Sequence, residues 1–210
     1  MTVQRNDGAD TEASAAGALG QRRLQRSADF TGRRIVSFQA VFLRHGLPGL
    51  LMAALFLAPS QMRSELAESL EAFAAAPMRY SAVALAVLLG MLALSAARYH
   101  RLDARQTGWI LYLLAVSAWE EWVFRLAIPE FGVSRGLDLG VAVVLSNVLF
   151  GLMHYFTLRW KWYWCVAACL GGIGLSRQMA LHHDLALVVG IHWVATFLNT
   201  PRPPRGSEPG

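Results

Sequence analysis

The sequence has few cysteines, and its long apolar stretches carry few charges and no alternation of polar with apolar residues. Of its 210 residues only two are cysteines, Cys165 and Cys169, and both lie within one apolar run rather than in loops. A disulfide framework needs more cysteines outside such runs, so we interpret both as small buried apolar residues. The missing alternation excludes a transmembrane β-barrel.

A concentrated basic surface is also missing. The formal net charge is +5, but the arginines gather at the ends of apolar runs rather than on one face, which argues against a nucleic-acid partner. Residues 1–34 are polar and lack the early apolar segment of a signal peptide. We therefore expect a disordered cytoplasmic tail over residues 1–30, one membrane domain over residues 31–200, and a second tail without structure over residues 201–210.

Apolar residues, in contrast, are abundant and make up 55% of the chain. They form six runs, at residues 35–58, 80–97, 108–128, 138–156, 160–176 and 185–199. A membrane span needs about 20 residues, and helices satisfy the backbone in lipid, so the runs predict an all-α membrane protein, a bundle of about six transmembrane helices. Residues 59–79 predict a short amphipathic helix on the membrane surface. Arg44, His45 and Pro48 predict a shortened or kinked first span.

The lysines and arginines between the runs predict the orientation of the bundle. Thirteen lie in the tails and in the loops 98–107 and 157–161, whereas four lie in the opposite loops. The positive-inside rule then places both termini in the cytoplasm. Small size, alanine-rich composition and the N-terminal arginines indicate a bacterial plasma membrane.

The third run, LLAVSAWEEWVFRLAI, contains Glu120, Glu121 and Arg125. An ionisable group costs roughly 2.5–3.5 kcal/mol at mid-membrane, so we expect these groups to face a protein interior or a wet cavity. Glu121 and Arg125 are four residues apart, acid first, and should form an ion pair. Glu120 points elsewhere without that partner, which makes it a candidate general base for a water molecule. Alternatively, the three groups only hold helices together.

Two further runs carry polar stripes. Asn147, Phe150 and His154 lie along one side of the fourth helix, and the sixth carries a second stripe of His192, Thr196 and Asn199. A single histidine on an apolar helix is usually a core residue. Two histidines from separate spans, with a double glutamate from a third, are typical of a pocket inside a bundle.

These residues resemble the CPBP family, which includes type II CAAX prenyl endopeptidases, bacteriocin-processing enzymes and ABI proteins. Glu120-Glu121-x-x-x-Arg125 is similar to its EExxxR motif, and Phe150-x-x-x-His154 is similar to its FxxxH motif. His192 corresponds to the histidine of its HxxxN motif. The resemblance covers residues 80–199.

The third motif departs from the family pattern. The asparagine expected four residues after His192 is replaced by Thr196. Asn199, one turn further along, and Asn147, beside His154, are the candidate replacements.

The resemblance implies an intramembrane endopeptidase that cuts near the end of a membrane-anchored protein or peptide precursor in the lipid bilayer. Glu120 and His154 would activate a water, and His192, with Asn199 or Thr196, would stabilise the oxyanion. Glu121 and Arg125 would support the helix and tune Glu120. Competing hypotheses are a non-catalytic scaffold or immunity protein of the same family and a proton-coupled transporter.

We expect no cofactor, because the sequence has no HExxH pattern. The alternative is a zinc ion held by Glu120, His154 and His192.

The predicted spans leave one conflict. Glu120 lies about eight residues before the end of its run and His154 about sixteen residues into the next, a depth difference of about 12 Å at 1.5 Å per residue. The two meet only if the third helix extends past Pro129, the fourth begins later, or the helices tilt strongly.

Overall fold

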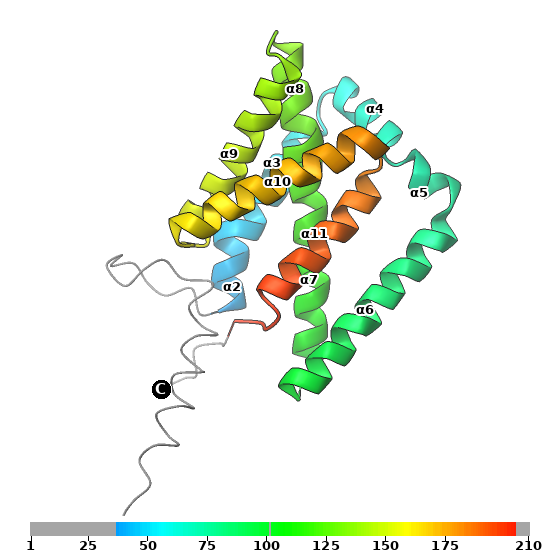
Figure 1. Ribbon diagram of the computed structural model, residues 1–210, viewed down its shortest axis with the longest axis vertical. Helices are drawn as coiled ribbons and strands as arrows, with labels where there is room; N and C mark the ends of the chain where they lie inside the picture. The colour runs from blue at the N-terminus through cyan, green and yellow to red at the C-terminus, as the bar shows by residue number, and fades with distance from the viewer. Residues whose placement is uncertain (1–36, 101, 205–210) are drawn as a thin grey trace, which may run out of the picture.

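The computed structural model describes residues 37–100 and 102–204, and these residues form helices without any strand (Figure 1). The tail predicted for residues 1–30 and the end of the second tail, residues 205–210, lie outside the described residues. Each of the six apolar runs corresponds to a helical segment, so the prediction of an all-α fold is confirmed.

The first segment is one continuous helix of α2 (Phe38–Val41), the π-helical turn η2 (Phe42–Gly46) and α3 (Leu47–Phe56). Two short helices follow, α4 (Ser60–Ser69) and α5 (Glu71–Ala75), where the sequence predicted one amphipathic helix. The remaining segments are α6 (Pro77–Tyr99), then α7 (Ala104–Glu121) continued by η3 (Trp122–Ala127) and α8 (Ile128–Ser134), then α9 (Leu139–Thr157), α10 (Trp162–His182) and α11 (Leu185–Asn199).

Three of the described helices are long and apolar enough to cross a membrane: Phe38–Phe56, Pro77–Arg98 and Leu139–Thr157. α11 is apolar but shorter. The outer faces of α6 and α9 expose large apolar side chains such as Leu85 and Leu149. Continuous apolar surfaces of this kind suit lipid rather than water, and the protein is an all-α membrane protein.

The third segment extends past Pro129 to Ser134, six residues beyond the predicted end of the run. Glu120 is therefore 14 residues before the end of its helix, and His154 is 15 residues after the start of α9. At 1.5 Å per residue these depths are about 21 and 22 Å. The longer helix removes the depth conflict.

A π-helical turn lets this helix continue through Pro129. In η3 the N–H of Ile128 donates to the carbonyl of Val123, five residues earlier. The next bond in this series would run from residue 129 to Phe124, but proline has no N–H. The hydroxyl of Ser146 on α9 donates to the Phe124 carbonyl instead, at 2.6 Å.

The first helix uses the same arrangement. In η2 the N–H of Leu47 donates to the carbonyl of Phe42, and Pro48 follows. The first span is therefore a continuous helix with a π-helical turn at Arg44 and His45, not a shortened one.

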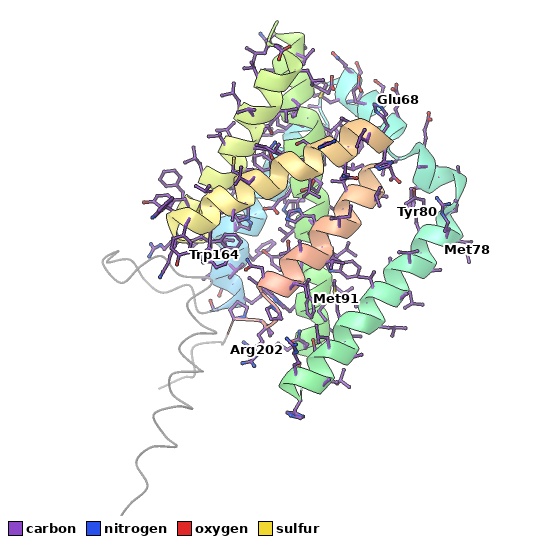
Figure 2. The ribbon with its side chains drawn as sticks, viewed as in Figure 1. Glu68, Met78, Tyr80, Met91, Trp164 and Arg202 are labelled. Atoms are coloured by element: carbon purple, nitrogen blue, oxygen red, sulfur yellow. The ribbon has the colours of Figure 1, made fainter. Side chains whose placement is uncertain are left out.

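The ends of α11 are fixed by neighbouring helices. Asp184 caps its first turn, accepting from the N–H of Leu187 at 3.0 Å, and also accepts from the hydroxyl of Tyr80, which lies near the start of α6 (Figure 2). Beyond its other end, Gln106 of α7 donates to the Pro201 carbonyl at 2.8 Å. Residues 201–204, which we expected to lie within a tail, are thus hydrogen-bonded to the start of α7.

Candidate active site

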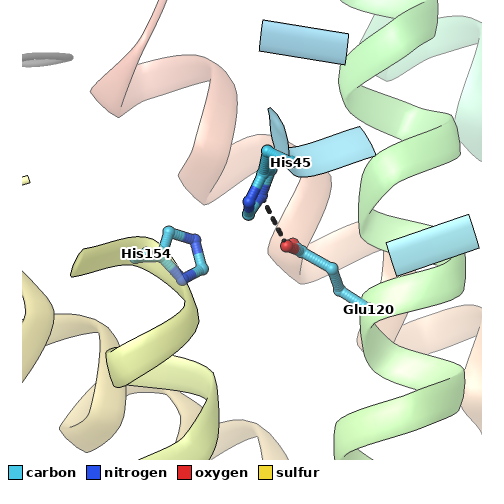
Figure 3. A group of neighbouring side chains, drawn as sticks. All are labelled: His45, Glu120 and His154. Carbon is cyan, nitrogen blue, oxygen red and sulfur yellow. Dashed lines mark ion pairs between the residues drawn. The ribbon is translucent and has the colours of Figure 1, made fainter. Parts of the chain in front are cut away.

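The carboxylate of Glu120 lies at the centre of the site and is 2% exposed. Its Oε1 is 2.8 Å from Nε2 of His45 (Figure 3). Its Oε2 is 3.8 Å from Nε2 of His192. Its closest partner comes from the first helix, which the sequence motifs did not include.

His154 approaches the same carboxylate from α9 (Figure 3). Its Nδ1 donates to the Phe150 carbonyl at 2.8 Å, because a carbonyl only accepts, and this leaves Nε2 for other contacts. The imidazole packs 4.5 Å from the ring of Phe150 and 4.7 Å from that of Trp160, centroid to centroid. The FxxxH spacing therefore serves two purposes: Phe150 supplies both a carbonyl and a ring that fix the histidine.

Glu121 and Arg125 form the predicted i,i+4 ion pair, with Nε and Oε2 3.0 Å apart. Glu121 Oε1 also lies 2.7 Å from Nδ1 of His192 on α11. The guanidinium of Arg125 lies 4.4 Å from the centroid of the Phe150 ring. This buried pair therefore joins α7, α9 and α11 behind Glu120.

Asn147 belongs to this supporting network. Its amide oxygen accepts from Arg125 at 3.0 Å, and its Nδ2 donates to the Val143 carbonyl and to the Ser176 hydroxyl. Gly172 of α10 leaves room for these groups, because a Cβ there would overlap the Asn147 amide and meet Arg125 at 3.0 Å. The amide of Asn147 is thus engaged by these three contacts.

A cavity of about 440 Å³ opens beside Glu120. Thr196 and Asn199, the other candidate replacements, both line it. His45, Glu120, His154 and His192 line it as well. The structure thus brings the three predicted catalytic residues to one hollow.

Among the described residues, the group with metal-binding geometry is His45, Glu120 and His154, whose ligand atoms lie within 4.8 Å of one another. The alternative zinc set that the sequence offered contained His192 in place of His45. His192 is not part of this group.

Sequence reasoning missed His45 as a functional residue. It interpreted this histidine only as a disturbance in an apolar run. The available signal was the neighbouring pattern: His45 precedes Pro48 by three residues, much as Arg125 precedes Pro129 by four.

Residues 105–198 match the family described as type II CAAX prenyl endopeptidase Rce1-like. Over this segment the chain is similar to that family, which supports the resemblance to the CPBP family. The match runs from the start of α7 to the end of α11, contains all three motifs, and leaves out the helix of His45. Neither the search of curated proteins nor that of solved structures gave a match. This match supports a protease activity in the membrane, as the motifs predicted.

Proposed function

We propose that this protein is an intramembrane endopeptidase that hydrolyses a peptide bond near the end of a membrane-anchored substrate, using a water held by Glu120 and His154. The observation that supports it is the convergence of one carboxylate and two imidazoles on a buried cavity from three helices. A ring nitrogen of His154 lies within 4.8 Å of a Glu120 oxygen without a direct hydrogen bond. That separation suits one bridging water.

In the proposed reaction the water oxygen attacks the peptide carbonyl carbon while Glu120 takes a water proton. The carbonyl oxygen becomes an oxyanion. The carbon–nitrogen bond then breaks, and Glu120 returns the proton to the leaving amine. No step in this sequence uses a metal ion.

The oxyanion needs donors on the cavity wall. Nδ1 of His192 donates to Glu121, and in the doubly protonated ring Nε2 also donates, towards the cavity beside Glu120. Thr196 or Asn199 supplies a second donor in place of the family's asparagine. The Glu121–Arg125 pair fixes this arrangement without touching the water.

The proposed substrate class follows from the family and the cavity lining. The family description names CAAX prenyl endopeptidases, and this cavity is walled by the aromatic rings of Trp109, Tyr112, Trp160 and Trp164. Such a wall suits an apolar group attached to a peptide. The cavity reaches Leu158 and Thr200, at the end of the bundle that the arginine count assigns to the cytoplasm.

Glu120→Gln tests the proposal. The full chain in lipid nanodiscs is given an internally quenched peptide that ends in a farnesylated CAAX sequence. In parallel, membrane peptides are compared between cells that express the wild type and cells that express the variant. Loss of the base should lower the cleavage rate by at least about 100-fold, while thermal unfolding stays near that of the wild type. His182→Gln, at an exposed histidine ending α10, is the control.

Equal processing by the wild type and Glu120→Gln in both assays would exclude the protease. A scaffold or immunity protein would keep its activity in this variant.

A further inference from the structure

His45 lies 75 residues before Glu120 and outside the segment that matches the family, yet it makes the closest contact to the Glu120 carboxylate. Both side chains are buried, at 4% and 2% exposure. The proposed reaction assigns this histidine no step. Its hydrogen bonds show what it can contribute.

The protons around His45 can be assigned from its neighbours. The Thr157 hydroxyl has one proton and donates it to the Met153 carbonyl at 2.7 Å. Thr157 Oγ1 must therefore accept from Nδ1 of His45, 2.7 Å away. On the other side of the ring, Nε2 and Oε1 of Glu120 are 2.8 Å apart, and two lone pairs cannot face each other at this distance. One proton lies between them.

The backbone around His45 is held by two neighbouring helices. Arg44 donates from Nε to the Thr157 carbonyl at 3.1 Å and from Nη2 to the Phe156 carbonyl at 3.3 Å, which ties η2 to the end of α9. Gly46 packs on α7, where a Cβ would come within 2.6 Å of the Tyr112 hydroxyl. The imidazole is therefore positioned from α9 and α7, the helices that carry His154 and Glu120.

We infer that His45 is a positioning residue for Glu120: its ring, anchored on Thr157, donates Nε2–H to Oε1, fixes the orientation of the carboxylate and leaves Oε2 for the attacking water. This inference rests on the proposed function. In the reaction Oε2 gains the water proton and passes it to the leaving amine. The proton on Nε2 stays in place throughout.

Other ionisable groups also face this pair. His154 approaches from α9 and His192 from α11. Tyr112 lies about two helical turns before Glu120 on α7. Glu121 and Arg125 neutralise each other behind Glu120. Of these groups, none forms a contact to Oε1 as short as that of His45.

The distance favours a proton over a metal ion between His45 and Glu120. Zinc holds nitrogen and oxygen ligands at about 2.0–2.2 Å in a tetrahedron, which separates two ligand atoms by about 3.3 Å. The observed 2.8 Å is an ordinary hydrogen-bond length.

The first test uses cleavage of the farnesylated peptide by the full chain in nanodiscs. Loss of the positioning contact in His45→Ala should lower kcat by about 100-fold with little change in KM. Thr157→Val should lower kcat less, and Thr157→Ser should restore it. An unchanged kcat in His45→Ala, or a loss that appears in KM and not in kcat, contradicts the inference, since a positioning residue acts on the reaction step and not on substrate binding.

The second test does not depend on activity. In ¹⁵N-histidine NMR spectra of the full chain, the His45 signal is assigned by its loss in His45→Gln. Both ring nitrogens should be protonated in the wild type, and Nε2 should lose its proton in Glu120→Gln. An unprotonated Nε2 in the wild type, or one zinc ion per chain that His45→Gln abolishes, overturns the inference. A protonated Nε2 in a protein without cleavage activity overturns the proposed function instead.

Discussion

The two π-helical turns differ in their surroundings although they share a local design. Each ends two residues before a proline, and each lies beside the site. All six residues of η3 are buried, and α9 supplies the hydroxyl that satisfies its free carbonyl. In η2 only His45 and Gly46 are buried, while Leu43 is 51% exposed.

The comparison separates stability from chemistry. Around η3, charged and polar groups pack against one another away from water, so that removing one leaves its partner unsatisfied. Around η2, the turn lies at the edge of the bundle and holds one imidazole against Glu120. We therefore expect changes near η3 to lower the free energy of unfolding and changes near η2 to lower the rate of cleavage.

Arg125→Met should have the largest effect on stability. It leaves Glu121 buried without its cation, which costs about 3–5 kcal/mol of unfolding free energy. Chemical unfolding in detergent micelles measures this loss. The double variant Glu121→Gln, Arg125→Met should recover most of it, because no buried charge remains unpaired. A loss below about 1 kcal/mol in the single variant would contradict the role assigned to the pair.

Gly172→Ala should lower the free energy of unfolding by about 2–3 kcal/mol, because the added methyl overlaps the Asn147 amide beside Arg125. Gly171→Ala is the matched control. Its Cβ meets no atom within 4 Å, so only the helix propensity changes, in favour of alanine. Equal unfolding midpoints for the two variants would show that α10 does not pack against this network as described.

Ser146→Ala removes the donor to the Phe124 carbonyl and should cost about 1–2 kcal/mol of unfolding free energy. Pro129→Ala restores a backbone N–H at the position where the π-helical series is interrupted. In the Ser146→Ala background it should therefore recover stability, and a thermodynamic cycle of the four proteins gives the coupling. Additive effects of the two changes would contradict the account of η3.

The sequence predicted those parts of the site that follow from residue spacing within one helix and from charged residues in apolar runs. The Glu121–Arg125 pair followed from helical periodicity, and the charges in an apolar run located the site. The end of the third helix was predicted too early, because a proline normally stops a helix and a π-helical turn has no sequence pattern as clear as a cap. His45 was missed because its partner lies 75 residues away, and a contact between distant helices leaves no periodicity in one sequence.

A change at Arg44, in η2, should have the smallest effect on stability and still lower the cleavage rate. Arg44→Ala removes two exposed hydrogen bonds to the end of α9 and should cost about 0.5–1 kcal/mol of unfolding free energy. Arg63→Ala is matched to it, since Arg63 also donates to two backbone carbonyls, those of Leu57 and Ala58, and should cost about as much. Only Arg44→Ala should also lower the cleavage rate, by several-fold, because η2 then holds His45 less firmly against Glu120. If both variants cleave the farnesylated peptide at the wild-type rate, the link from α9 through η2 to the carboxylate does not contribute to catalysis, and the edge position of η2 has no functional consequence.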